Sequence, residues 1–291
     1  MAAQDQNRKT ISTFHEKKQQ KTPLTMVTAY DYTSALIADE AGLDAILVGD
    51  SLGMTMMGHE TTLQVTMDIM AYHCQSVARA VKRTFLIADM PFLSYQVSVE
   101  EAIRNAGRLI SEGGADAVKL EGGMEFLPVV KAIIRAGIPV MGHLGLTPQS
   151  VLKFGGFRMQ ARLADQAAKL VDDAFGLQES GCFSLVLESI PDNLAGYISQ
   201  KLHIPTIGIG AGNQCDGQVL VWQDLLGMNK DFRPKFAKAY ADLHETISKA
   251  LISYQNDVIA RSFPAAEHSR AMDAEEWRAF LECMHEKESN D

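Results

Sequence analysis

Five short apolar runs of this chain each end in ionisable residues, and this pattern restricts the possible folds more than any other feature. The runs are LDAILVGDS, TFLIADMP, DAVKLEGG, IPVMGHLG and SLVLES, and their polar ends are Asp50, Asp89, Lys119 with Glu121, His143 and Glu188. Their apolar parts are rich in Val, Ile and Leu and show no alternation with polar positions, which is typical of strands buried on both faces. Because the runs share one pattern, we expect their polar ends to face one place.

The segments between most of these runs have the spacing of helices. Residues 33–41 end at a glycine, residues 67–81 carry apolar side chains at helical intervals, and residues 100–110 precede a pair of glycines. Strand and helix therefore alternate, which predicts a parallel sheet. The runs LTMVTAYD, IPTIGIGAG and QVLVW raise the number of expected strands to eight. This number favours an α/β fold of the closed (β/α)8 TIM barrel type over an open doubly wound sheet, and in such barrels the C-terminal strand ends carry the active site.

The composition fits one catalytic domain and argues against some partners. Of 291 residues, 46% are hydrophobic, and the formal net charge of -9 disfavours nucleic acid and anionic membranes as partners. No apolar stretch approaches the length of a transmembrane helix, and the N-terminus lacks the apolar part of a secretory signal. The cysteines at positions 74, 182, 215 and 283 are scattered, which predicts a reduced, cytoplasmic protein.

We expect three parts in the chain. A polar extension of residues 1–21, either disordered or folded as a helix under the barrel, precedes a barrel domain of residues 22–262. The pattern predicts that this domain ends in one long helix from Pro234 to Ser262, followed by a helical tail of residues 263–291. The apolar positions of the tail are Trp277, Phe280, Leu281 and Met284. They either pack on the chain's own barrel or form a subunit contact.

Three acids among the polar ends suggest a metal site. Asp50, Asp89 and Glu121 would supply carboxylate oxygens from three different strands, without sulfur ligands. Such a donor set suits Mg²⁺, which keeps several waters and leaves positions open for a substrate. An aspartate after a strand also often caps the next helix or turns a loop, and this is the alternative for Asp50 or Asp89 taken alone.

Lys119 and Glu121 are two positions apart in one strand, so both side chains should point into the mouth of the barrel. A lysine buried there could hold a substrate carboxylate or form a Schiff base, or it could pair with Glu121 for structural reasons. Glu188 ends the sixth strand with no Lys or Arg nearby in sequence. A carboxylate in such a pocket can have a raised pKa and act as a general base.

His143 lies in GHLGLTPQS, whose glycines allow the backbone to approach a ligand closely. We expect it to contact the substrate, although a histidine at such a position more often has only structural partners.

The GIGAG pattern after the seventh strand lacks the G-x-G-x-x-G spacing of dinucleotide binding, so close backbone approach at the barrel mouth is the better interpretation. The methionine-rich piece GMTMMGH predicts a long loop that fills the core or contacts a flat apolar ligand.

Nine motifs of the chain resemble those of one family. VTAYDYTSA, LVGDSLGMTMMGHETT, IADMPF, VKLEGG, GHLGLTPQS, FGGF, IPTIGIGAG, DGQVLV and FPAAEHS follow one another in this order. Together they resemble the ketopantoate hydroxymethyltransferase family over roughly residues 9–269. Several of the motifs are long and family-specific, so chance is a poor explanation. The tail after about Ser269 departs from the usual end of the family.

The resemblance implies a Mg²⁺-dependent enzyme that moves a one-carbon unit from 5,10-methylenetetrahydrofolate to 3-methyl-2-oxobutanoate, giving ketopantoate for pantothenate and coenzyme A synthesis. It implies that Asp50 and Asp89 bind the metal and with it the keto acid, and that Glu121 reaches the metal as well. Lys119 and Ser51 are implied as contacts to the keto acid, and the glutamate at the end of strand six, Glu188, as the proton acceptor that forms a Mg-stabilised enolate. The family also implies a homo-oligomer, a decamer.

Two other functions are compatible with such a barrel. A Mg²⁺-dependent oxo-acid lyase of the isocitrate lyase and phosphoenolpyruvate mutase type would share the metal site, but it should carry a K-C-G-H loop, which this sequence lacks. A catalytically silent scaffold subunit would have no reason to retain five ionisable strand ends. Proton exchange that depends on the keto acid would separate an enzyme from a scaffold.

Overall fold

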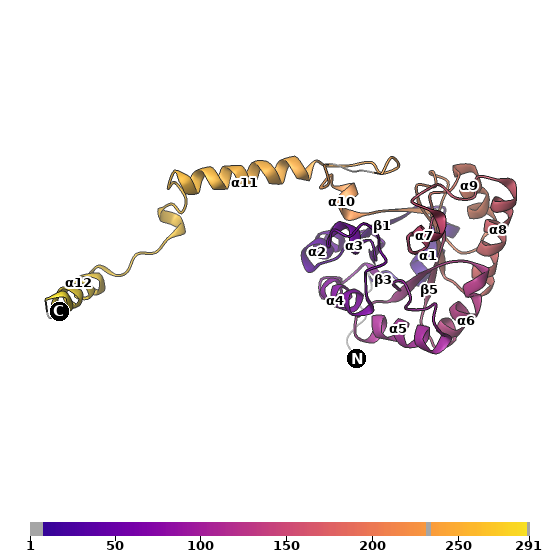
Figure 1. The fold of residues 1–291 in the computed structure, drawn as a ribbon, viewed down its shortest axis with the longest axis horizontal. Coiled ribbons are helices and arrows are strands. Elements are labelled where there is room, and N and C mark those ends of the chain that lie inside the picture. The colour runs from indigo at the N-terminus through magenta and orange to yellow at the C-terminus, as the bar shows by residue number, and fades with distance from the viewer. Residues whose placement is uncertain (1–7, 231–233, 290–291) are drawn as a thin grey trace. The chain divides into compact units, whose positions relative to one another are not determined.

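The structure, a computed structural model, describes residues 8–230 and 234–289 and confirms the eight-stranded barrel. All strands pair in parallel in the order of the sequence, and β8 closes the barrel against β1 (Figure 1). The strands are β1 (Leu24–Thr28), β2 (Ala45–Val48), β3 (Phe85–Asp89), β4 (Ala117–Glu121), β5 (Val140–Gly145), β6 (Ser184–Glu188), β7 (Thr206–Ile209) and β8 (Gly217–Leu220). Every residue of β2, β3 and β4 is buried, as expected for strands covered on both faces.

The longer helices surround the sheet on its outer side, and helices of only four residues lie in the connections after β2, β5 and β8 (Figure 1). They are α2 (Tyr32–Glu40), α3 (Leu52–Thr55), α4 (Met67–Ala78), α5 (Val99–Ser111), α6 (Leu127–Arg135), α7 (Val151–Phe154), α8 (Ala164–Glu179), α9 (Asp192–Lys201) and α10 (Trp222–Leu225), with short 3-10 turns at Met124–Phe126 and Pro148–Ser150. The helices α2, α4 and α5 coincide with the three that the sequence predicted. Residues 210–216 join β7 to β8 as a loop instead of a helix.

The N-terminal segment folds as a helix, which decides between the two expected alternatives where the segment is described. Helix α1 (Ile11–Gln19) covers the N-terminal end of the barrel, and Phe14 is only 1% exposed. The Phe14 ring packs edge-on against Phe85 and Phe183, with ring centroids 5.6 and 5.4 Å apart. These rings belong to the apolar cluster inside the barrel, so α1 acts as its plug. Residues 1–7 of the predicted extension lie outside the described residues.

Three cations of this segment bind aspartates that stand just before barrel strands. The pairs are Arg8–Asp116 at 2.8 Å, Lys17–Asp44 at 2.6 Å and Lys18–Asp216 at 2.7 Å. Each aspartate also accepts a backbone N–H from the preceding strand, donated by Leu86, Thr25 and Thr206 respectively. The aspartates therefore tie neighbouring strands to each other and to the N-terminal segment.

The contacts of the chain divide it into two compact units, residues 1–240 and 241–291. The second unit contains α11 (Leu243–Ile259), a 3-10 turn (Ala266–His268) and α12 (Ala274–Glu288), and none of its described residues is buried. Helix α12 forms within the tail that was expected to be helical. The boundaries at residues 22 and 262 and the packing partner of the tail stay predictions. Among the described residues, no helix is long and apolar enough to cross a membrane.

The sequence pattern placed the start of the long helix too early, at Pro234. Helix α11 begins at Leu243, because the Asp242 side chain caps it by accepting the backbone N–H of Glu245 at 3.3 Å. Before the cap, the backbone N–H of Tyr240 donates to the carbonyl of Leu225 at 2.8 Å, a contact that a helix through this position would not make. The helical spacing of apolar residues in the sequence continues across this break. The regular helical hydrogen bonds, however, begin only after the Asp242 cap.

Candidate active site

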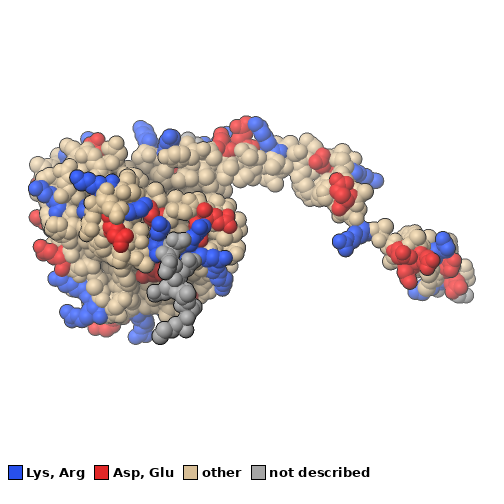
Figure 2. Space-filling view, turned by 180° about the vertical axis from the view of Figure 1, so that it is seen from behind, with Lys and Arg blue, Asp and Glu red and all other residues tan. Residues whose placement is uncertain are grey.

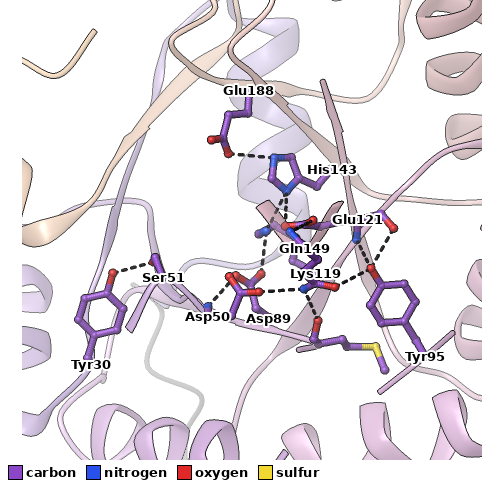
Figure 3. Close-up of polar contacts among 11 residues, drawn as sticks. Tyr30, Asp50, Ser51, Asp89, Tyr95, Lys119, Glu121, His143, Gln149 and Glu188 are labelled. Carbon is purple, nitrogen blue, oxygen red and sulfur yellow. Dashed lines mark hydrogen bonds and ion pairs between the residues drawn. The ribbon is translucent and has the colours of Figure 1, made fainter. Parts of the chain in front are cut away.

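The predicted polar residues meet at the C-terminal ends of neighbouring strands. They are Asp50 and Ser51 after β2, Asp89 at the end of β3, Lys119 and Glu121 in β4, His143 in β5 and Glu188 at the end of β6. The strand register places Asp89 beside Lys119 and Glu121 beside His143. Figure 3 shows the side chains converging on one another.

Lys119 pairs with Asp89 rather than with Glu121. Its Nζ lies 2.8 Å from Asp89 Oδ1, and Asp89 Oδ2 accepts the backbone N–H of Asp50 at 3.1 Å. Burial by itself would lower the pKa of Lys119, but the carboxylates of Asp89, Glu121 and Asp50 outweigh this effect and raise it. The ammonium group therefore stays charged inside the mouth of the barrel, which makes a neutral Schiff-base lysine a poor interpretation.

If Asp50, Asp89 and Glu121 were all ionised, their negative charge would exceed what the one lysine balances, and this raises the pKa of two of them. Burial first, and then the charges of Asp89 and Glu121, raise the pKa of Asp50 well above its usual range. Burial, partly offset by Lys119, raises the pKa of Glu121 to about 8. Both shifts have the same physical cause, since carboxylates removed from water and placed near one another resist ionisation.

Gln149 connects these two acids, and the sequence reasoning missed it. Its Nε2 donates to Asp50 Oδ2 and to the carbonyl of Met90, each at 2.9 Å, and its backbone N–H donates to Glu121 Oε2 at 3.0 Å. The Tyr95 hydroxyl lies 3.0 Å from Gln149 Oε1 and accepts the backbone N–H of Glu121 at 3.2 Å. Gln149 lies inside GHLGLTPQS, so the motif pointed to this region, but nothing in it singled out the glutamine.

His143 lies between the buried acids and Glu188. Its Nδ1 is 3.2 Å from Lys119 Nζ and its Nε2 is 3.1 Å from Glu188 Oε2. Burial, and then the charge of Lys119, lower the pKa of His143 against the opposing effect of Glu188. The ring is therefore neutral at pH 7. Because an ammonium group can only donate, Nδ1 accepts from Lys119, and the ring proton lies on Nε2, which faces Glu188.

Glu188 is the most accessible acid of the group. Its side chain is 16% exposed, compared with 5% for Asp89 and 4% for Glu121. The end of β5 runs close beside it, with Gly145 at φ +95°, and a Cβ atom on Gly145 would lie 2.2 Å from the Glu188 carbonyl oxygen. Only glycine fits there, and the close approach is to the chain's own backbone, whereas the approach to a ligand expected for this motif stays a prediction.

Ser51 has a tyrosine partner that the sequence reasoning also missed. Its Oγ lies 2.8 Å from the hydroxyl of Tyr30. Burial, opposed mainly by this hydrogen bond, raises the pKa of Tyr30 to about 12, so the hydroxyl keeps its proton. Tyr30 can therefore hold Ser51 in one orientation. Its position in VTAYDYTSA was part of the resemblance, although the motif did not indicate a role.

Two sequence interpretations change in detail. The methionine-rich piece was expected to be a long loop, but its start forms the short helix α3. The glycines of GIGAG approach the chain itself, because a Cβ on Gly210 would lie 2.9 Å from the Phe236 ring and one on Gly212 would lie 2.5 Å from Asp192. Packing within the protein therefore accounts for both glycines.

The site fits a divalent cation by charge and donor chemistry. Three buried carboxylates face one ammonium group, and Asp89 Oδ1 makes no aligned hydrogen bond although Lys119 is near. Within residues 8–230 and 234–289, no group of three or more His, Cys, Asp or Glu side chains is arranged to hold a metal ion by itself. Mg²⁺ often takes only one or two protein carboxylates and keeps its waters, so the arrangement suits a partly hydrated ion better than a complete protein cage.

Comparison with known proteins identifies the family. The model described as ketopantoate hydroxymethyltransferase matches residues 8–266. The chain belongs to this family. A relative named 3-methyl-2-oxobutanoate hydroxymethyltransferase from Moorella thermoacetica is 56% identical over 90% of this chain and 98% of its own length. Another of the same name from Acetivibrio thermocellus is 55% identical, covering 91% of this chain and 93% of its own. The resemblance seen in the sequence motifs is confirmed.

Solved structures with the same fold come from other enzymes. A 2,3-dimethylmalate lyase of the PEP mutase/isocitrate lyase superfamily has a TM-score of 0.56 and 15% identity, covering 97% of this chain and 98% of its own. A phosphonopyruvate hydrolase in complex with oxalate and Mg++ has a TM-score of 0.57 and 12% identity, covering 96% and 98%. At these identities the likeness shows the TIM barrel that this ketopantoate hydroxymethyltransferase family member shares with them.

Proposed function

We propose that this enzyme transfers a hydroxymethyl group to 3-methyl-2-oxobutanoate, takes the carbon from 5,10-methylenetetrahydrofolate, and forms ketopantoate for pantothenate and coenzyme A synthesis. The family and the names of its relatives support the substrates. The observation that carries the proposal is the separation of roles among the acids. Glu188 is partly exposed and stands across His143 from the buried acids, so one carboxylate is available as a base.

The buried side of the site would bind the keto acid. Asp50 and Asp89 would hold Mg²⁺, with Glu121 as a further acid for it. When bound, the ion polarises the keto group of the substrate and makes its neighbouring C–H more acidic. The charged Lys119 offsets the substrate carboxylate, and Ser51, oriented by Tyr30, donates a hydrogen bond to it. These contacts fix C3 of the keto acid in position.

Glu188 takes the proton from C3 as the general base. The neutral His143 presents its Nε2 proton toward this carboxylate, so it orients the base without competing for the proton. We also propose that His143 contacts the bound keto acid, because its ring is placed between Lys119 and Glu188.

The overall reaction balances with one water molecule. A C–C bond forms between C3 and the methylene carbon, and both C–N bonds of that carbon break. Water supplies the hydroxyl group of ketopantoate. The C3 proton and the remaining proton of water complete the two N–H groups of tetrahydrofolate.

The rival lyase has weaker support. The folds of the lyase and mutase structures are similar, but the identities of 15% and 12% carry the fold alone, while the family model matches residues 8–266. A silent scaffold is disfavoured by the convergence of the five strand ends.

We further propose that the protein works in the cytoplasm as a homo-oligomer, as its scattered cysteines and the resemblance imply.

The test is ketopantoate formation from both substrates. We expect a chelator to abolish turnover and added Mg²⁺ to restore it, and we expect Asp89→Asn to weaken metal and keto-acid binding together in isothermal titration. Asp68→Asn, at an 85% exposed side chain on α4, is the matched control and should bind both normally. Full activity of metal-free protein, or no ketopantoate from the two substrates, would contradict the proposal.

A further inference from the structure

Gln149 is a neutral side chain that lies among the buried acids. It stands in the 3-10 turn Pro148–Ser150 after β5 and reaches Asp50, which follows β2, so the contact spans the ends of β4 and β3 in the sheet order (Figure 3). Gln149 is only 6% exposed. An amide removed from water in this way needs partners within the protein.

Every hydrogen-bonding position of this amide has a partner. Nε2 donates to Asp50 Oδ2 and to the carbonyl of Met90, each at 2.9 Å. Oε1 accepts from the Tyr95 hydroxyl at 3.0 Å and from Gln96 Nε2 at 3.3 Å. A primary amide has two protons to donate and two lone pairs that accept, so a flipped amide would turn its oxygen toward two acceptors. The surroundings of Gln149 therefore fix its N–H toward Asp50.

The carboxylate of Asp50 depends on this amide more than its neighbours do. Asp89 has Lys119 at 2.8 Å and the backbone N–H of Asp50 at 3.1 Å. Glu121 accepts the backbone N–H of Gln149 at 3.0 Å. In the part of the chain that the structure describes, the bond from Gln149 Nε2 is the only hydrogen bond that the Asp50 carboxylate accepts. One removable side chain therefore holds this acid.

The amide also stands where the buried acids meet open space. A cavity of about 660 Å³ lies beside Glu121, and Tyr95, Gln96 and Gln149 form part of its wall. Gln149 is therefore part of the mouth of the barrel, and a change in its side chain acts on the site before it acts on the apolar core.

We propose that Gln149 is a positioning residue for the enolisation of the keto acid, because its amide, oriented by Tyr95, holds the Asp50 carboxylate in one orientation for Mg²⁺. The inference rests on the proposed function, which assigns Asp50 to the metal. Gln149 acts through Asp50 and not on the reacting carbon. Without the amide, the carboxylate has to be ordered when the ion binds, so the effect appears in the affinity for the ion.

The test is Gln149→Met, which keeps the approximate bulk of the side chain, removes the amide and leaves the backbone N–H for Glu121. Isothermal titration in the presence of keto acid should show about tenfold weaker binding of Mg²⁺, from loss of one hydrogen bond to a charged group. Exchange of the C3 proton in D₂O should need more Mg²⁺ for its half-maximal rate, while the rate at saturating Mg²⁺ stays within about twofold of the wild type. Gln200→Met makes the same change at an exposed position of α9 and should match the wild type in both measurements.

A double variant tests the part that Tyr95 plays. Its hydroxyl also lies 3.0 Å from the carbonyl of Glu121, so Tyr95→Phe alone could act on either neighbour. If the hydroxyl acts by orienting the amide, Tyr95→Phe weakens Mg²⁺ binding in the wild type but adds little to Gln149→Met. Fully additive effects would show that Tyr95 acts on Glu121 independently and would overturn its assigned role.

Three other results bear on the inference. Unchanged Mg²⁺ affinity in Gln149→Met would overturn it, and so would a saturated exchange rate that falls as far as the affinity, since the substitution would then disturb the whole mouth of the barrel. Gln149→Asn keeps an amide that is one methylene too short to span the gap, and it gives the same comparison if Gln149→Met does not fold. If wild-type enzyme neither binds Mg²⁺ with keto acid nor exchanges the proton, the proposed function itself is wrong.

Discussion

At the scale of single residues, His143 and Gln149 connect the acids of the candidate site. Gln149 holds Asp50 and Glu121 together on the buried side, through its side chain and its backbone N–H. His143 contacts Lys119 with one nitrogen and Glu188 with the other. Neither residue is itself an acid. Gln149 therefore joins two buried acids, whereas His143 stands between the buried group and the more exposed Glu188.

The residue that we expect to matter most for proton transfer is Glu188. The variant Glu188→Gln keeps the size of the side chain and removes its basicity. It should still bind keto acid and Mg²⁺, but proton exchange at C3 and turnover should both fall by about 10² to 10⁴, the usual contribution of a general base. NMR in D₂O without folate measures the exchange, and Glu100→Gln, exposed on α5, is the matched control.

Two outcomes would contradict this role. Exchange at the wild-type rate in Glu188→Gln would show that another group is the base, and His143 would be the next candidate. Loss of keto-acid binding in the variant would instead make Glu188 part of the binding site.

At the scale of elements, α1 stabilises the barrel from the end opposite to the active site. It supplies Phe14 to the interior cluster, and its segment supplies three cations to aspartates before β2, β4 and β8. Because parallel strands have no hairpins to hold their starts together, these contacts fix the strand ends at the base. The rigid base in turn holds the strand ends that carry the candidate site residues.

Removing the Phe14 ring tests this role of α1. Phe14→Ala should lower the free energy of unfolding by about 3–5 kcal/mol, because a fully buried ring leaves a cavity among packed aromatic neighbours. Tyr72→Ala, at a side chain that is 67% exposed on α4, should change it by less than about 0.5 kcal/mol. Urea unfolding at one fixed protein concentration measures both. Equal stability of the two variants would mean that α1 is not part of the core.

At the scale of the whole molecule, the two units differ in how much of their surface is buried. The barrel unit has a large core, whereas the second unit exposes Trp277, Phe280, Leu281 and Met284 along α12. Over the face of the barrel unit visible in Figure 2, basic and acidic side chains are interspersed. A mixed surface of this kind limits the field of either sign. The apolar positions of α12 are therefore the more distinctive surface feature.

We expect the protein to be a homo-oligomer and the tail to contribute to its contacts. A chain that ends at Arg270 lacks α12 and should form a smaller or weaker assembly than the full-length protein, because it loses the four apolar side chains of this helix. Light scattering over a range of concentrations compares the two. A monomeric full-length protein would contradict the first expectation, and an unchanged assembly after truncation would contradict the second.

The sequence by itself determined the barrel and most of the site. Buried parallel strands leave a continuous apolar run for each strand, and the ionisable residue at the end of each run is visible without coordinates, as with Asp89 or His143. Such patterns can be read from the sequence because each strand is buried on both faces and needs its own apolar run. The start of α11 was misplaced because a helical period does not reveal where an aspartate caps the chain.

Only the tertiary structure decided which of these residues touch. It paired Lys119 with Asp89 instead of Glu121 and placed Gln149 between two acids from different strands. It also joined Phe14 to the barrel interior and formed the cavity beside Glu121. These contacts link segments that are distant in the sequence, and their distances depend on barrel closure and strand register. No local pattern of residues encodes them.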